Sequence, residues 1–196
     1  MASVVYSGKD LTPDVVVDET WFSDPIVCEN MKHIYAVSKT LAEQAAWKFA
    51  NENGIELVTI HPGVTVGPLL QPTINDSVSL IMNLINGPQH FPNKVYSFLD
   101  VRDVACAHVQ AFEIASASGR YCLPGYVAHI SEPLKILQQL YPALTIPEKC
   151  EDNKPLKPIY KVSELKAKSL GINLIPLEVS LRETVESLKE KGLFNF

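Results

Sequence analysis

This sequence has no excess of basic residues. Its 17 Lys and Arg residues are outnumbered by 22 Asp and Glu residues, and the formal net charge at pH 7 is −5. Nucleic acid is therefore not expected as a partner, because proteins that bind it concentrate positive charge. No stretch approaches the ~18 continuous apolar residues of a membrane span. The first eight residues also lack the basic and apolar regions of a signal peptide. The sequence predicts a cytoplasmic protein with no membrane partner.

Cysteine is also scarce and unclustered. The four cysteines are Cys28, Cys106, Cys122 and Cys150, and they form no Cys-x-x-Cys pair and no His/Cys group with zinc spacing. No metal site is therefore predicted. Reduced and mostly buried thiols are the expected state of such cysteines in a cytosolic protein.

The composition allows a buried core, and the order of elements indicates a fold class. The 196 residues are 46% hydrophobic and 20% charged, near the average for globular domains. A long helix is predicted to begin at Asp24-Pro25 and to end near Asn53, where Gly54 supplies a stop signal. Residues 55–60 follow as an apolar strand of the kind found in parallel sheets. A helix that leads into such a strand is typical of a doubly wound α/β fold.

Further elements are expected on both sides of this unit. Strands are predicted at 2–6, 95–99 and 119–123, a turn at 12–14, and helices at 75–86, 103–115, 131–140 and 163–171. Asp103 is predicted to cap its helix, and Ser180 and Glu183 to form a capping box that opens the last helix. His108 is interpreted as a core histidine rather than a ligand.

The most informative residues are Tyr35 and Lys39, which stand four apart in the predicted long helix. This spacing places both side chains on one helix face, roughly 5–6 Å apart at Cβ. A cation near a phenol favours the phenolate and lowers the phenol pKa. Such a phenol can donate a proton to a carbonyl oxygen while hydride reaches the carbonyl carbon. Alone the pair is a weak signal, because an exposed Tyr and a solvated Lys at this spacing occur in many helices.

The surrounding residues make the signal more specific. Tyr35-Ala-Val-Ser-Lys39-Thr-Leu-Ala-Glu43 is followed, after Gly54, by an apolar run and then by His61-Pro-Gly-Val-Thr-Val-Gly-Pro68. Together these motifs resemble the extended short-chain dehydrogenase/reductase family. Within that family the motifs are more similar to a plant subgroup of the dihydroflavonol-reductase superfamily. This subgroup contains phenylacetaldehyde reductases and cinnamyl-alcohol-dehydrogenase-like and cinnamoyl-CoA-reductase-like proteins. The segments 12–21, 67–73 and 116–122 resemble the same subgroup.

The resemblance implies a fold and a domain arrangement. It predicts the C-terminal part of a doubly wound, Rossmann-type α/β protein with a small, mostly helical substrate domain. Residues 1–123 would belong to the NAD(P)-binding domain, with a substrate-domain insertion around 68–95. Residues 124–196 would form mainly the substrate domain, and because the two are interleaved this boundary is approximate.

The resemblance also implies site residues and a cofactor. Tyr35 would be the proton donor, and Lys39 would tune Tyr35 and hold the nicotinamide ribose. NADP is the expected cofactor, with NAD as the alternative. His61 is expected to serve local packing rather than catalysis. The other residues expected to contact the cofactor are Pro62, Gly63, Val64, Thr65 and Ser77.

The sequence departs from the family pattern in three ways. It contains no Gly-x-Gly-x-x-Gly or Gly-x-x-Gly-x-x-Gly, the turn that binds a pyrophosphate. By the alignment of motifs, the chain corresponds to about the C-terminal three fifths of the family, and the family's catalytic Ser immediately precedes Met1. Finally, true cinnamoyl-CoA reductases carry Asn-Trp immediately before the Tyr, whereas this sequence has Lys32-His33-Ile34 before Tyr35. That replacement favours a free aldehyde or ketone over a CoA thioester.

Two hypotheses of different kinds follow. The first is an NADP-dependent enzyme that interconverts an aromatic or phenylpropanoid aldehyde or ketone with its alcohol; cinnamyl alcohols and dihydroflavonols are alternative substrates. The second is a non-catalytic remnant or interaction module that lacks the Gly-rich cofactor motif, so that this chain alone would be inactive. The sequence leaves the exact substrate and the oligomeric state open.

Overall fold

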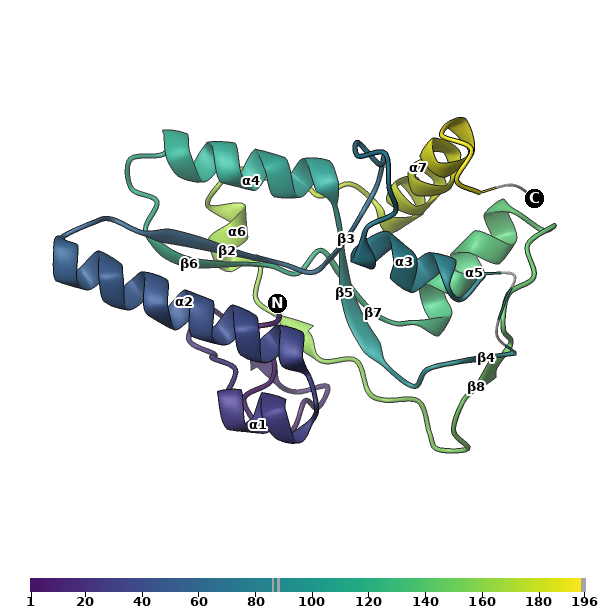
Figure 1. The fold of residues 1–196 in the computed structure, drawn as a ribbon, viewed down its shortest axis with the longest axis horizontal. Helices are drawn as coiled ribbons and strands as arrows, with labels where there is room; N and C mark the ends of the chain where they lie inside the picture. The colour runs from purple at the N-terminus through teal and green to yellow at the C-terminus, as the bar shows by residue number, and fades with distance from the viewer. Residues whose placement is uncertain (86, 88, 195–196) are drawn as a thin grey trace. The chain divides into compact units, whose positions relative to one another are not determined.

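A computed structural model describes residues 1–85, 87 and 89–194. These residues divide into two compact units, each assembled from three separate segments (Figure 1). Unit 1 comprises Met1–Pro62, Ala105–Pro124 and Tyr160–Asn173. Unit 2 comprises Gly63–Val104, Gly125–Ile159 and Leu174–Phe196. No helix within the described residues is both long and apolar enough to cross a membrane.

Unit 1 is built on a parallel pair of strands. Strand β2 (Val58–Pro62) pairs with β6 (Gly119–Leu123), and the register runs from Val58 opposite Gly119 to Pro62 opposite Leu123. Helix α2 (Ile34–Asn53) and helix α4 (Val101–Glu113), which enters unit 1 at residue 105, lie on opposite sides of this pair (Figure 1). Parallel strands covered by helices on both sides are the signature of a doubly wound α/β fold.

The predicted long helix is in fact two helices. Asp24 caps α1 (Pro25–Asn30) by accepting hydrogen bonds from the backbone N–H groups of Ile26 and Val27. The helix then ends at Asn30, and Lys32, two residues later, has a positive φ of 58°. The N–H of Lys32 bonds to Glu29 O and the N–H of His33 bonds to Cys28 O. This is the Schellman pattern of helix termination. Because Lys32 takes the place usually held by glycine, the sequence did not signal the break.

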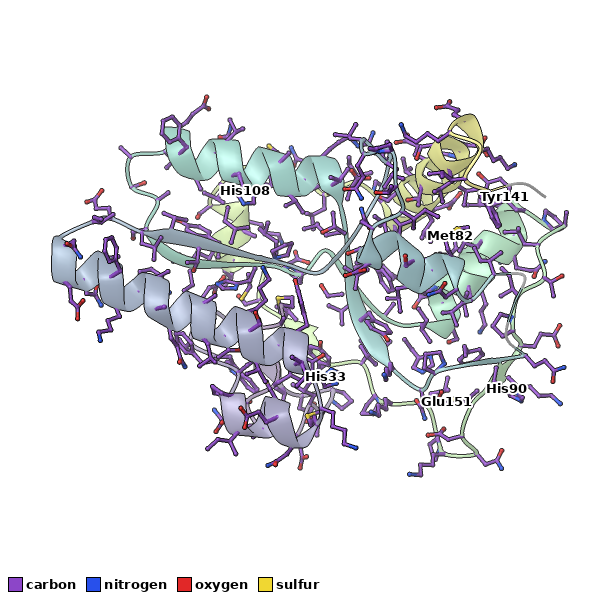
Figure 2. All side chains as sticks on the ribbon, viewed as in Figure 1. His33, Met82, His90, His108, Tyr141 and Glu151 are labelled. Carbon is purple, nitrogen blue, oxygen red and sulfur yellow. The ribbon has the colours of Figure 1, made fainter. Side chains whose placement is uncertain are left out.

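Helix α2 begins at Ile34 and ends as predicted. Gly54 adopts the left-handed conformation (φ 63°) at its C-cap. His33, labelled in Figure 2 at the start of α2, stacks on the ring of Tyr6 at 4.9 Å between centroids. The strand predicted at 55–60 starts three residues later, at Val58, and continues through Pro62.

Other expectations for unit 1 need correction. Residues 2–4 form a turn rather than a strand, because the N–H of Val4 bonds to Met1 O. The predicted turn at 12–14 is present, closed by a bond from Val15 N–H to Thr12 O. Two short elements were not predicted: β1 (Val16–Val17) pairs in parallel with β9 (Lys161–Val162). Helix α6 spans Leu165–Lys168, shorter than the predicted 163–171.

Unit 2 contains a mixed sheet with helices packed on it. Strand β5 pairs in parallel with β3 and antiparallel with β7, and β4 pairs in parallel with β8. The elements are β3 (Val64–Val66), α3 (Asp76–Met82), β4 (His90–Phe91), β5 (Val95–Asp100), β7 (Tyr126–His129), α5 (Ser131–Leu140), β8 (Lys149–Cys150) and α7 (Leu177–Glu190). The bounds of α5 agree with the prediction, and β5 runs one residue further than predicted.

The core of unit 2 explains how α7 is held. Leu181 and Val185 on α7 pack with Phe98 of β5 and Leu134 of α5 in one buried cluster. Leu188 joins Leu69 and Val78 in a second cluster. The apolar side of this helix, formed by Leu181, Val185 and Leu188, is therefore buried.

The helix starts in unit 2 differ from the predicted caps. Helix α7 begins at Leu177, so Ser180 lies inside it and donates to Asp100 instead of forming a capping box. Asp103 lies within the first turn of α4, and it is Asp100 that accepts the N–H of Arg102 there. Helix α3 ends at Met82, four residues before the predicted end, and Asn86 and Pro88 lie outside the described residues.

The expectation for the burial of His108 also changes. His108, labelled on α4 in Figure 2, is exposed rather than part of a core, and Phe112 on the same helix is 90% exposed. With Val109 51% exposed as well, α4 carries apolar side chains that face solvent. The four cysteines are free: Cys28 and Cys122 are buried, Cys150 is half-buried and Cys106 is exposed.

Candidate functional site

Tyr35 and Lys39 lie in the first two turns of α2, and both side chains are exposed. Tyr35 is 68% exposed, and the Lys39 Nζ lies 5.7 Å from the centroid of its ring. That distance is within the range of a cation–π contact. The helix thus presents a phenol hydroxyl and an ammonium group to solvent from adjacent turns, where both can reach a ligand.

Most of residues 62–65, which are predicted to contact the cofactor, lie in extended strands. Pro62 is the last residue of β2, and Val64 and Thr65 belong to β3, where they pair with Phe98 and Leu99. Backbone pairing therefore continues on either side of Gly63.

Gly63 has a structural reason to be glycine. A Cβ at this position would collide with the carbonyl oxygen of Ser97 on β5. The hydroxyl of Thr65 also donates to Gly63 O at 3.4 Å. The glycine therefore permits close approach of β5, which is a packing role within unit 2.

Ser77, the remaining predicted contact residue, is half-buried in the first turn of α3, after the cap at Asn75. Tyr35, Lys39 and Pro62 belong to unit 1, and Ser77 belongs to unit 2 together with 63–65.

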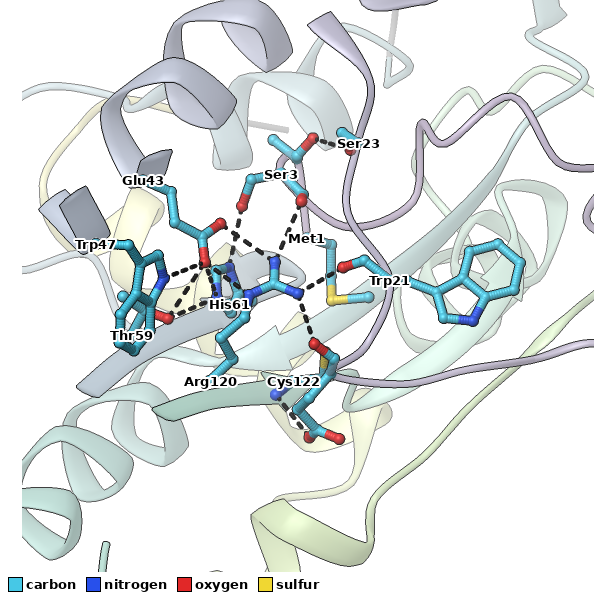
Figure 3. A network of polar contacts seen from close by, with 12 residues as sticks. Met1, Ser3, Trp21, Ser23, Glu43, Trp47, Thr59, His61, Arg120 and Cys122 are labelled. Atoms are coloured by element: carbon cyan, nitrogen blue, oxygen red, sulfur yellow. Dashed lines mark hydrogen bonds and ion pairs between the residues drawn. The ribbon is translucent and has the colours of Figure 1, made fainter. Parts of the chain in front are cut away.

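Behind the exposed pair, α2 carries a buried carboxylate that is the centre of a polar network (Figure 3). Glu43 follows Lys39 by one turn and is only 8% exposed. The Arg120 Nε donates to Glu43 Oε1 at 2.6 Å, and Arg120 Nη2 donates to Oε2 at 3.2 Å. Trp47 Nε1 and the Thr59 hydroxyl also donate to Oε1, at 3.2 and 3.4 Å. Helix α2 is thereby joined to both strands of the parallel pair.

His61 completes this network from β2. Its Nε2 lies 3.2 Å from Glu43 Oε1 and 3.0 Å from the Thr59 hydroxyl, and its Nδ1 lies 3.1 Å from the Ser3 hydroxyl. Burial alone would raise the pKa of Glu43, but hydrogen bonds from His61, Arg120 and Ser3 outweigh it and hold that pKa well below its usual range. Glu43 is therefore an ionised, fully bonded carboxylate, and His61 is buried within packing contacts.

Arg120 extends the network to the loop before α1. Its Nη1 donates to the carbonyl oxygens of Glu19 and Trp21 at 2.7 and 2.5 Å, and Nη2 donates to Ser3 O at 3.2 Å. The guanidinium also lies over the ring of Phe22 at 3.8 Å. These contacts orient the guanidinium from several sides.

Sequence reasoning missed the Glu43–Arg120 pair. The two residues are 77 positions apart, and no local spacing connects them. A usable signal was present, however, because Arg120 is the charged residue of the otherwise apolar strand Gly-Arg-Tyr-Cys-Leu. A charge in a buried strand requires a partner of opposite sign.

Unit 2 has its own buried carboxylate. Asp100 ends β5 at 1% exposure and accepts hydrogen bonds from Arg102 Nε, Arg102 Nη2 and the Ser180 hydroxyl, at 2.8, 2.9 and 2.7 Å. Burial would raise the pKa of Asp100, but these donors outweigh it and lower that pKa. Burial raises the pKa of Asp103, whose carboxylate accepts the N–H of Ile175. These contacts fasten the segment before and at the start of α7, so we assign them to stability.

We searched the part of the chain that the structure describes for residues that could bind a metal ion. No group of three or more His, Cys, Asp or Glu residues there is arranged to hold a metal ion. The exposed pair itself offers a phenol and an ammonium group.

Comparison with known proteins places this geometry in a family. The model of the NAD dependent epimerase/dehydratase family matches residues 5–121. The chain is 60% identical over 195 residues to "Cinnamoyl-CoA reductase CAD2" of Medicago truncatula, covering 100% of this chain and 60% of that protein. It is 44% identical to "Cinnamoyl-CoA reductase 1" of Petunia hybrida, covering 96% of this chain and 57% of that protein.

Solved structures agree with the sequence relatives. Vestitone reductase from alfalfa (Medicago sativa L.) superposes with a TM-score of 0.83 at 30% identity, covering 98% of this chain and 63% of that one. The yeast methylglyoxal/isovaleraldehyde reductase Gre2, complexed with NADPH, superposes with a TM-score of 0.79 at 26% identity over 98% of this chain and 63% of that one.

These matches decide two of the predictions. The chain spans about three fifths of the length of the curated relatives it matches. Over that span they confirm the predicted resemblance to extended short-chain reductases of the cinnamoyl-CoA-reductase-like type, and they confirm the Rossmann-type α/β fold. With its family model matched over residues 5–121, the chain belongs to the NAD dependent epimerase/dehydratase family.

Proposed function

We propose that residues 1–196 form part of an NADP-dependent reductase that converts an aromatic or phenylpropanoid aldehyde or ketone to its alcohol. The supporting observation is the exposed pair on α2, in which the Lys39 ammonium lies 5.7 Å from the Tyr35 ring. The relatives support the reaction class, since they are named as reductases and one solved neighbour contains NADPH.

The proposed mechanism assigns one role to each member of the pair. When bound, NADPH would supply the hydride for the carbonyl carbon of the substrate. The Tyr35 hydroxyl donates its proton to the carbonyl oxygen, which becomes the alcohol oxygen. The Lys39 ammonium stabilises the phenolate left on Tyr35, because an adjacent cation favours the charged form of a phenol. Lys39 also has donors for the ribose hydroxyls of the cofactor.

The residues present fit one end of such a cofactor. Tyr35 and Lys39 are exposed and carry donors suited to a nicotinamide ribose. The Gly-rich turn that would hold the pyrophosphate is not encoded in these 196 residues. The resemblance assigns further cofactor contacts to Pro62, Gly63, Val64, Thr65 and Ser77. It assigns residues 1–123, with an insertion around 68–95, to the cofactor-binding domain, and these assignments stay predictions.

Within this reaction class we propose a free aldehyde or ketone as the substrate. The residues before Tyr35 support this choice, because His33 and Ile34 stand where the resemblance expects the Asn-Trp of true cinnamoyl-CoA reductases. His33 is stacked on Tyr6, and Ile34 is 70% exposed, so this corner presents an apolar side chain. A CoA thioester is the second candidate, because the relatives of 60% and 44% identity are named cinnamoyl-CoA reductases.

The test joins residues 1–196 to the part of the Medicago truncatula relative that has no counterpart in this chain; we call the product the joined protein. NADPH oxidation is followed with phenylacetaldehyde, a cinnamyl aldehyde and a cinnamoyl-CoA thioester. We expect saturable turnover with the free aldehydes. Turnover confined to the thioester would establish the second candidate. Absence of turnover with every substrate would favour the alternative hypothesis of a non-catalytic remnant.

A substitution at position 35 tests the role of Tyr35 separately. Tyr35→Phe should lower kcat by roughly 10²–10⁴-fold, the usual cost of removing a positioned general acid. NADPH affinity should change much less. Tyr126→Phe is the matched control, because Tyr126 is an exposed tyrosine of unit 2. Near-normal turnover by Tyr35→Phe at neutral pH would remove Tyr35 from the mechanism.

A further inference from the structure

The catalytic face of α2 lies at its lightly anchored end. The helix begins after His33, whose side chain makes no capping hydrogen bond, and Ile34 and Tyr35 are 70% and 68% exposed. Ile34 and Tyr35 themselves are therefore not held by packing into a core. The position of Tyr35 depends on contacts made further along the helix.

The buried side of α2 offers little shape to fix the helix. Its buried residues are Ala36, Thr40, Glu43 and Ala50. Ala36 and Ala50 each bury a single methyl group, and the Thr40 hydroxyl bonds to Ala36 O within the same helix. Small side chains resist sliding or rotation of a helix poorly, because they interdigitate little with their neighbours. Glu43 is the largest of the four and the one that bonds to other elements.

Glu43 is well placed to set the axial position of the pair. Tyr35, Lys39 and Glu43 recur every fourth residue, so Glu43 lies about 12 Å along the helix axis from Tyr35. Its carboxylate receives two hydrogen bonds from Arg120, one to each oxygen. A two-point contact between a planar guanidinium and a carboxylate fixes orientation as well as distance.

Arg120 is itself held independently of α2. It projects from the paired strand β6, and the carbonyl oxygens of Ser3, Glu19 and Trp21 accept its remaining hydrogen bonds. The strands and loops of unit 1 therefore hold the guanidinium in place without help from α2. Because Glu43 bonds to this guanidinium, the position of the guanidinium determines the position of α2.

From this geometry we propose that Glu43 and Arg120 are positioning residues for the reaction: they hold α2 in the register that places Tyr35 and Lys39 for proton transfer. The inference rests on the proposed function for its catalytic consequence. The structural part, that the pair determines where Tyr35 sits, can be tested without any activity.

The expected consequence of loosening the pair is a loss of rate. A displacement of about 1 Å at a catalytic group can lower the rate by roughly 10²-fold. Such a change removes stabilisation made in the transition state, so kcat falls while KM for the aldehyde changes little. A purely structural role would lower stability without this separation.

The experiment uses Glu43→Gln and Arg120→Lys in the joined protein, each of which keeps most of the side-chain volume. Glu52→Gln is the matched control, because Glu52 lies on the same helix with a side chain that is 60% exposed. Fluorotyrosine placed at position 35 reports the environment of that ring by fluorine NMR. The kcat and KM of an aldehyde substrate are measured on the same samples.

We expect the fluorine signal at Tyr35 to shift or broaden in both folded variants, with kcat lowered roughly 10–100-fold. Glu52→Gln should leave both readouts unchanged. An unchanged fluorine signal, or unchanged kcat in an active protein, would overturn the inference. If Glu43→Gln does not fold, Arg120→Lys decides. Loss of folding in both would assign the pair to stability alone. If the unmutated joined protein has no reductase activity, the proposed function fails and the fluorine signal alone decides the positioning claim.

Discussion

Replacing Arg120 by Met should destabilise unit 1 strongly. The substitution keeps an unbranched side chain but removes both donors to Glu43, and it leaves the carbonyl oxygens of Glu19 and Trp21 without that partner. Glu43 is then a buried carboxylate facing neutral donors and His61. Breaking a buried ion pair from one side typically costs about 3–5 kcal/mol. About 1 kcal/mol corresponds to roughly 2–4 °C for 150–250 residues and to less in the longer joined protein, so Tm should fall by at most roughly 20 °C.

The decisive measurement is a double-mutant cycle in the joined protein, with unfolding followed by circular dichroism in heat and urea. Glu43→Gln added to Arg120→Met removes the unpaired charge, so the double variant should be more stable than the summed single effects predict. Lys48→Met is the matched control, because the Lys48 side chain is 75% exposed and lies 3.9 Å from Glu52. It should cost less than about 1 kcal/mol. Additive effects within about 0.5 kcal/mol would refute a coupled, buried ion pair.

Four further outcomes are expected. Lys39→Met should raise the Kd for NADPH in a fluorescence titration and move the pH–rate profile to higher pH; if neither changes, Lys39 is a surface charge. Gly125→Ala should lower the urea midpoint more than Gly171→Ala, because both residues have positive φ but a Cβ at Gly125 would collide with Phe98 O, whereas Gly171 faces open space. Because folding depresses the Glu43 pKa, its contribution to stability is complete above the unfolded value near 4.5 and is lost as pH falls towards the folded pKa. Stability against pH should thus decline below about pH 4.5 in the parent and less steeply in Glu43→Gln; equal slopes would contradict this. Residues 1–196 expressed alone should neither bind NADPH tightly nor reduce phenylacetaldehyde, and saturable turnover by that chain would show that the phosphate-binding turn is dispensable.

Local chemistry was enough to predict many of the elements. Asp24 caps a helix and Gly54 ends one, as predicted, because each acts through its own backbone geometry. The strand at 119–123 and the helix at 131–140 have the predicted bounds. The break at Lys32 was missed, because a left-handed lysine is determined by tertiary contacts rather than by an intrinsic preference.

The candidate site was predictable only in part. The spacing of Tyr35 and Lys39 needs only a helix, and the structure supplies that helix. The Glu43–Arg120 pair and the close approach of Ser97 to Gly63 depend on contacts between distant parts of the chain. Single-sequence patterns contain periods of two and about four residues, so they cannot report which distant side chains meet.

The interleaving of the two units constrains how this protein is made. Unit 1 needs β9 and α6 from Tyr160–Asn173, almost a hundred residues after its first segment ends at Pro62. At translation rates of roughly 5–20 residues per second, that gap lasts on the order of 5–20 s. Unit 2 waits longer, because the hydroxyls of Thr184 and Ser187 on α7 accept the N–H groups of Gly67 and Leu69. Each unit is complete only when its own last segment has emerged, so β1 stays without its partner β9 over this interval, and chaperones have that time in which to bind.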